Sequence, residues 1–148
     1  MAMSGGSKMR DELNRIAERV QSANSVDVGF LQGSTNSETG ASIPMYAAVN
    51  EFGAPSRGQP PRPFFRNMIA ANSPGWGEEM AEAVKARDYD AASALAVMGK
   101  LIQGQLQASI FDLTSPPLSP KTIARKGFDK PLVDTSDMVK SVAYEVKE

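Results

Sequence analysis

Apolar and polar positions follow two different periods near the start of the chain. After residues 1–6, which we interpret as a disordered lead, an apolar stripe at helical spacing predicts a helix over residues 7–24. Val26, Val28 and Phe30 then alternate with polar or small residues, which predicts a β-strand. The helical stripe is formed by Met9, Leu13, Ile16, Ala17 and Val20.

A polar stretch at residues 33–42 separates this strand from the next apolar group. Its small and polar residues predict an exposed loop or a hairpin tip. Ser42 and Pro44 are typical of a helix start, because a serine can cap the first turn and proline fits there. We therefore expect a short helix that ends at Gly53, where glycine can adopt the left-handed turn that closes a helix end.

Helical spacing returns in the middle of the chain. Residues 64–71 follow it until the Ser-Pro-Gly sequence at residues 73–75, which predicts a break. A second helix is expected over residues 77–87, and Asp90 can cap the long helix that follows. The core stripe of that long helix consists of Ala91, Leu95, Met98, Ile102, Leu106 and Ile110.

Two glycines interrupt the long helix. Gly99 and Gly104 cost about 1 kcal/mol each relative to alanine, which predicts close helix packing at these positions. Residues 112–120 then form a proline-bearing connection, and residues 119–123 have the pattern of a short capped helix.

The order of these elements predicts an α+β fold. A closing strand is expected over residues 142–146, where apolar and polar positions alternate again. We expect it to pair with residues 26–30 in a small antiparallel sheet, with several helices packed against it. The chain of 148 residues fits a single domain, which we place at residues 7–148.

Composition excludes several kinds of chemistry. The chain has no cysteine and no histidine, so disulfides, the common zinc sites and Ser–His–Asp triads cannot form. We expect no catalytic residues, no metal and no cofactor. The formal net charge of −1 gives no general attraction to nucleic acid or to an anionic membrane. The polar start of the sequence and the absence of a long apolar run predict a cytoplasmic protein without a membrane segment.

The densest cluster of unusual residues lies at residues 50–66, here called the 50–66 segment. It holds four prolines, two glycines, three phenylalanines and three arginines, with one acid. Prolines make the loop stiff, and its arginines have no acid close by in sequence. A stiff loop loses little entropy on docking, which favours an interface with another subunit. The candidate interface residues are Phe52, Arg57, Arg62, Phe64, Phe65 and Arg66; the two phenylalanines at 64 and 65 are equally compatible with the core of the domain.

A second group of charges lies toward the C-terminus. It is interpreted first as a solvated basic surface, and alternatively as a contact with DNA phosphates in a channel or with an acidic partner. The group lacks the interleaved aromatic residues of single-strand binders. Its members are Lys121, Arg125, Lys126 and Lys130.

Two sequence motifs resemble those of one bacteriophage family, the tail-completion or neck proteins of long-tailed double-stranded DNA phages. The first is Asn-Glu-Phe-Gly at residues 50–53 with Pro-x-Arg-Pro-Phe-Phe-Arg at residues 60–66. The second motif comprises Leu-Ser-Pro-x-Thr at 118–122, Lys-Gly at 126–127, Lys-Pro-Leu-Val-Asp-Thr at 130–135 and Ser-Val-x-Tyr-x-Val at 141–146. The chain departs from the family pattern at one position of this second motif, where Ser136 follows the Asp-Thr pair in place of the usual glycine.

The resemblance implies a structural virion protein that completes the tail and joins it to the head. It implies a homo-oligomeric ring, commonly hexameric, between a head-closure or connector ring and the tail terminator or tail tube. Such a protein would be made in the host cytoplasm and end in the virion, with non-specific DNA contact in the channel. Three alternatives stay open. They are a tail terminator or head-closure protein of the same neck, a bacterial or prophage-encoded binding module outside the virion, and a small hydrolase that uses only carboxylates, against which the missing histidine and cysteine weigh.

Overall fold

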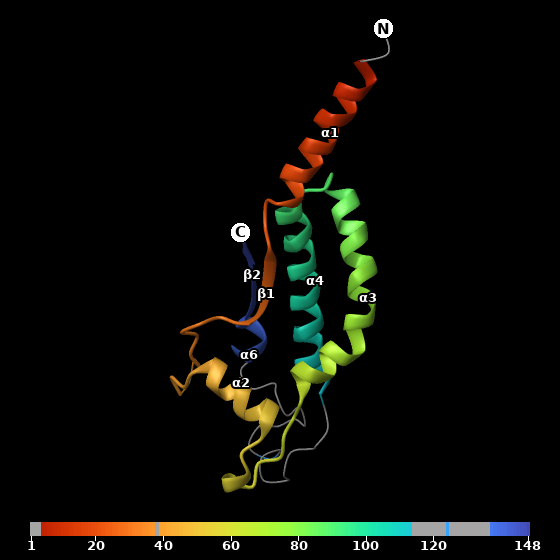
Figure 1. Cartoon of the computed structure of the whole chain (residues 1–148). Coiled ribbons are helices and arrows are strands. Elements are labelled where there is room, and N and C mark those ends of the chain that lie inside the picture. Colours follow the sequence, from red (N-terminus) through yellow and green to blue (C-terminus); the bar gives the residue numbers. More distant parts are fainter. Residues whose placement is uncertain (1–3, 38, 114–123, 125–136) are drawn as a thin grey trace. The chain divides into compact units, whose positions relative to one another are not determined.

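The computed structural model describes residues 4–37, 39–113, 124 and 137–148 (Figure 1). The described elements confirm the expected α+β class. In chain order they are α1 (Ser4–Val20), β1 (Ser25–Phe30), α2 (Ile43–Phe52), the 3-10 turn η1 (Pro55–Arg57), α3 (Phe64–Ala86), α4 (Ala91–Asp112), α6 (Asp137–Lys140) and β2 (Val142–Lys147).

The two strands pair with each other, as the sequence predicts. The N–H of Asn24 donates to the carbonyl of Lys147 at 2.8 Å, and the N–H of Leu31 donates to the carbonyl of Ser141 at 2.9 Å. These bonds close the two ends of an antiparallel ribbon. Each strand is one residue longer than the sequence pattern indicates.

The chain divides into two compact units. Unit 1 comprises Met1–Asp27, Gly75–Leu101 and Tyr144–Glu148, and unit 2 comprises Val28–Pro74 and Ile102–Ala143. Helices α3 and α4 and both strands contribute residues to each unit. The single domain expected over residues 7–148 stays a prediction.

Unit 2 has its core where α2, the first part of α3, the second part of α4 and α6 supply apolar side chains. Phe64 and Met68 of α3 and Leu106 and Ile110 of α4 are almost completely buried. Helix α6 lies against α2 and adds Met138 to this core.

The predicted core stripe of the long helix runs through both units. It is confirmed at its buried positions, Ala91, Met98, Leu106 and Ile110, while Leu95 and Ile102 are half-buried.

Helix α3 continues through Pro74, so the predicted break at residues 73–75 is wrong. Proline lacks the N–H of a regular helix and costs roughly 3 kcal/mol in a helix interior. Buried side chains lie on both sides of this position. Met68 before the proline and Ala83 after it are both buried, so packing on either side keeps the helix continuous.

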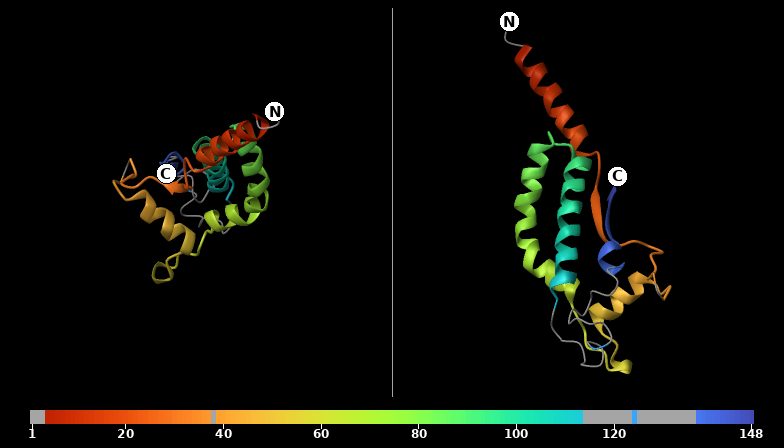
Figure 2. Two further views of the ribbon diagram at one scale, coloured as in Figure 1. Left: turned by 45° about the horizontal axis from the view of Figure 1, so that its top comes forward. Right: turned by 180° about the vertical axis from the view of Figure 1, so that it is seen from behind.

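Polar contacts attach α1 to the other segments of unit 1. Arg15 forms ion pairs with Glu12 at 2.7 Å and with Asp88 at 2.8 Å. Arg19 donates to the backbone carbonyls of Asp88 at 2.8 Å and Arg87 at 3.3 Å. The first turns of α1 extend away from α3 and α4 (Figure 1 and Figure 2). The helix begins at Ser4, inside the lead expected at residues 1–6, and ends at Val20, before the expected residue 24.

The connection between α3 and α4 is a tight turn that Asp90 completes. Asp88 and Tyr89 have φ values of 52° and 60°, in the left-handed region. The carbonyl of Asp90 accepts the N–H of Ala94 at 3.0 Å, and its carboxylate accepts the hydroxyls of Ser93 and Ser22. The backbone N–H of Ser93 also bonds to this carboxylate, and that contact confirms Asp90 as the cap of α4.

Acid should weaken unit 1. Hydrogen bonds from Arg15 lower the pKa values of Glu12 and Asp88, and bonds from Ser93 and Ser22 lower the pKa of Asp90. The stability from carboxylates with depressed pKa values is present above their unfolded pKa, about 4, and is lost as the pH falls through the folded values. We expect thermal melts to show a falling Tm from pH 6 to pH 3. The Asp88→Asn variant lacks one of these carboxylates, so its Tm should fall less than that of the wild-type protein over the same pH range. An equal fall of Tm in the two proteins would contradict the role given to Asp88.

The two glycines of α4 differ in their surroundings. A Cβ on Gly99 would lie 2.5 Å from the Tyr144 ring and 2.8 Å from Val26, so the helix packs tightly on the strand pair. The same atom on Gly104 would meet nothing within 4 Å. Close packing is thus found at Gly99, against strands instead of a helix, and the expectation for Gly104 is wrong.

This contrast predicts opposite effects of alanine. Gly99→Ala should lower the free energy of unfolding by about 1–3 kcal/mol, because the added methyl group overpacks the interface with the strands. Gly104→Ala should raise it by about 0.5–1 kcal/mol, because alanine restricts the unfolded chain and favours helix. Urea unfolding of both variants measures the difference, and equal effects of the two substitutions would refute this packing.

Candidate functional site

The 50–66 segment joins α2 to α3 in unit 2. Ser42 caps α2 by accepting the N–H of Met45 at 3.5 Å, as the sequence predicts. The helix ends before Gly53 as expected, but Gly53 has a φ of 77° and a ψ of 175°, so it does not adopt the expected left-handed turn. A Cβ there would lie 2.8 Å from the backbone nitrogen of Pro61, so the loop returns directly over the end of α2.

Backbone and side-chain hydrogen bonds hold this loop in one conformation. Ala54 and Gln59 exchange backbone bonds of 2.9 and 3.1 Å across the η1 turn. Asn50 is buried; its side-chain amide donates to the carbonyl of Tyr46 and its side-chain oxygen accepts from Gln59. The carbonyl of Asn50 also accepts the N–H of Arg62 at 2.6 Å. Proline stiffness is therefore one of two sources of order in the segment.

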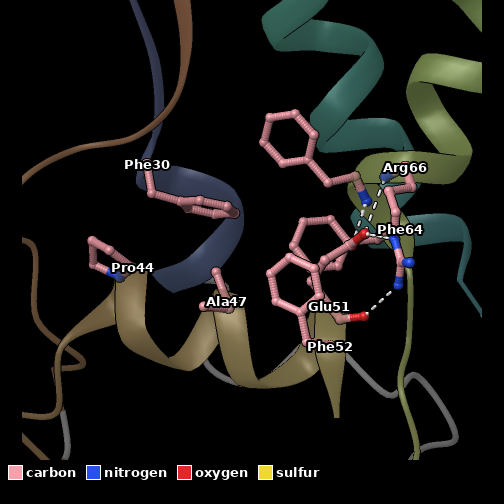
Figure 3. A pocket seen from close by; sticks show the side chains of 9 residues that line it. Phe30, Pro44, Ala47, Glu51, Phe52, Phe64 and Arg66 are labelled. Carbon is pink, nitrogen blue, oxygen red and sulfur yellow. Dashed lines mark hydrogen bonds and ion pairs between the residues drawn. The ribbon is translucent and has the colours of Figure 1, made fainter.

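Glu51 connects the two ends of the segment. Its side chain is buried, and the carboxylate accepts the backbone N–H groups of Phe65 at 2.9 Å and Arg66 at 3.3 Å. The side chain of Arg66 donates to the same carboxylate at 2.7 Å and to the carbonyl of Glu51 at 3.0 Å (Figure 3). The carboxylate thus neutralises the positive end of α3 and the guanidinium together.

This ion pair corrects part of the sequence interpretation. Arg66 has an acidic partner, Glu51, which lies too far away in sequence to be recognised as one. Arg62 is 8% exposed and Phe64 is 1% exposed, so both are packed inside unit 2 and are not available as interface residues. Phe64 fills the core, where its ring meets that of Phe30 edge-on at 6.0 Å.

The remaining candidates are more accessible. Phe52 is 68% exposed, and the guanidinium of Arg66 lies 5.4 Å from the centre of its ring. Arg57 is exposed in η1, and Phe65 is half-buried. The structure brings Phe52, Phe65 and Arg66 together and leaves Arg57 on the loop. The four basic residues at Lys121, Arg125, Lys126 and Lys130 lie outside the described residues.

An open apolar hollow of about 270 Å³ lies beside this group. Rings and small side chains from β1, α2 and the start of α3 form its wall, with Glu51 and Arg66 at one side (Figure 3). On α2, Met45 and Tyr46 are also exposed, so the apolar stripe that helical spacing gives at Met45, Val49 and Phe52 does not face the core at Met45 or Phe52. The apolar lining residues are Phe30, Pro44, Ala47, Ala48, Phe52, Phe64 and Phe65.

The chemistry of this hollow suits binding. It offers an apolar wall with a cation at its edge, to which an apolar side chain with a nearby acceptor would be complementary. Within the ranges that the structure describes, no group of three or more acidic residues is placed to hold a metal ion, and no helix is long and apolar enough to cross a membrane. No protein-family model, no curated protein and no solved structure matches the chain.

Glu51 should be the most sensitive position of the site. Glu51→Gln keeps the shape but removes the charge, so the free energy of unfolding should fall by about 2 kcal/mol, as for other hydrogen bonds to charged groups. Glu79→Gln makes the same change at an exposed position of α3 and should have little effect. Urea unfolding measures both, and equal losses would contradict the role of Glu51.

Proposed function

We propose that this chain is a structural virion protein of a phage neck. In this proposal it completes the tail and joins it to the head as part of a homo-oligomeric, six-fold ring. It is made in the host cytoplasm, is incorporated into the virion and acts by assembly without catalysis. Its partners are the head-closure or connector ring and the tail terminator or tail tube.

One observation carries the proposal beyond the two sequence motifs. Phe52 is exposed at the end of α2 and Arg57 in the turn that follows, where the backbone is fixed by Glu51, Asn50 and the Ala54–Gln59 bridge. A large exposed aromatic ring and an arginine on a rigid support are the residues that contribute most to protein interfaces. Because the loop is already ordered, little conformational entropy is lost when it docks.

A ring needs contacts of a particular kind. Neighbouring subunits in a closed ring use two different surfaces, repeated head to tail. The exposed side of α2, with Met45 and Phe52, together with Arg57 supplies one such surface in unit 2. In the proposal the basic residues at 121–130 contact a partner ring or the DNA in the channel.

The test changes exposed side chains of the proposed interface and leaves the buried side chains as they are. Phe52→Ser combined with Arg57→Glu should leave a folded protein, because both side chains are exposed. We expect a subunit contact about 30-fold weaker, as for the loss of a hot spot of about 2 kcal/mol. Complementation of a phage that lacks the gene should then yield separate heads and tails in electron micrographs.

The control is Lys85→Glu, which reverses an exposed charge on α3 in unit 1 and should join heads to tails normally. Normal yields of joined virions from the double variant would refute the proposed interface. Binding of the purified protein to the end of the tail tube alone favours the terminator alternative, and binding to the connector alone favours head closure. A protein that forms no rings and binds neither is a module outside the virion.

A further inference from the structure

Helix α1 is attached to the rest of unit 1 by its polar side. Arg15 and Arg19 bind the turn between α3 and α4, and Glu12 binds Arg15. At about 100° per residue, the stripe of Met9, Leu13, Ile16 and Val20 lies on the helix face next to the one that carries Glu12, Arg15 and Arg19. Met9 is 67% exposed and Leu13 is 60% exposed. Helix α1, the most amphipathic helix of the unit, thus leaves Met9, Leu13 and Val20 largely exposed, while Ile16 is half-buried.

The spacing of this stripe is that of a coiled-coil seam. Met9, Leu13, Ile16 and Val20 follow one another at steps of four, three and four residues, which are d, a, d and a positions of two heptads. The seam is narrow and has no aromatic residue, unlike the face of a helix that lies on a lipid surface. The polar faces carry both signs of charge, from Lys8, Arg10, Arg15 and Arg19 and from Asp11, Glu12 and Glu18.

We propose that the α1 stripe is covered by α1 of a second copy of this chain, with the two helices antiparallel. In that register Leu13 faces Ile16 of the second copy and Met9 faces Val20. Four apolar layers form, each made of one a and one d residue. The stripe then becomes buried as amphipathic helices normally are.

Charge selects the antiparallel orientation. Glu12 and Arg19 occupy the g positions beside the seam, and in an antiparallel pair the g positions of the two helices face each other. Glu12 of each copy therefore meets Arg19 of the other, which gives two complementary pairs. In a parallel pair Glu12 would instead face Ala17. Arg19 has five N–H donors, and two bind the carbonyls of Asp88 and Arg87, so the guanidinium can serve both contacts.

This contact does not depend on the proposed neck function. It is two-fold symmetric and pairs copies, whereas a ring grows through a head-to-tail contact. The two proposals therefore fail independently: pairing through α1 can be measured on the purified full-length protein, without phage particles.

The first measurement is sedimentation velocity of the full chain at increasing concentration, from about 1 to 100 µM, where association through a small interface is seen. We expect a reversible dimer. Leu13→Asp should remove it, because it places a charge in the seam, and the exposed position should leave the circular dichroism spectrum unchanged. Asn14→Asp adds the same charge outside the seam and should dimerise normally.

Charge reversal then tests the orientation. Glu12→Arg and Arg19→Glu should each weaken the dimer about tenfold, since like charges meet at two sites. An equimolar mixture of the two variants, and the double variant alone, should recover wild-type association, because every g pair is again complementary. An unaffected Leu13→Asp dimer, no recovery on mixing, a monomer at all concentrations, or binding of α1 to anionic vesicles in place of self-association would each overturn the proposal.

Discussion

The buried carboxylate of Glu51 is the interaction on which the candidate site depends. A buried carboxylate without partners is strongly destabilising, so its position is fixed by the donors around it. Those donors are the first N–H groups of α3 and the guanidinium of Arg66. Because Glu51 lies at the end of α2, the carboxylate sets where α3 begins relative to α2 within unit 2. The loop, the cation beside Phe52 and the apolar hollow all follow from that placement.

Features that arise from neighbouring residues could be predicted from the sequence. The strands, the cap at Ser42, the end of α2 before Gly53 and the cap at Asp90 all depend on residue types within a few positions. The ion pair between Glu51 and Arg66 could not be predicted in this way, because its two partners are brought together only by the path of the proline-rich loop. One signal was present: Glu51 is the single acid of a segment with three arginines, and a buried acid needs a cation.

Local rules failed where packing outweighed them. Pro74 has the pattern of a helix break, yet α3 passes through it, because buried contacts on both sides favour the continuous helix. Gly99 and Gly104 look alike in sequence, but Tyr144 and Val26 crowd only the first. Which glycine matters depends on residues far away in sequence, and propensity contains no such information.

The apolar stripe of α1 and the exposed side of α2 are two surfaces for which the sequence does not identify a partner. Periodicity predicts that an apolar stripe will be covered, but it does not say by which molecule. For α1 the polar anchors Arg15 and Arg19 bind its own unit, and the neighbouring apolar stripe is the surface that the proposed second copy covers. A two-fold contact is saturated once two copies pair, whereas a head-to-tail contact leaves one surface free on each added subunit. Under the two proposals the chain can therefore pair in solution and still enter a ring, because the two proposed contacts use different residues in different units.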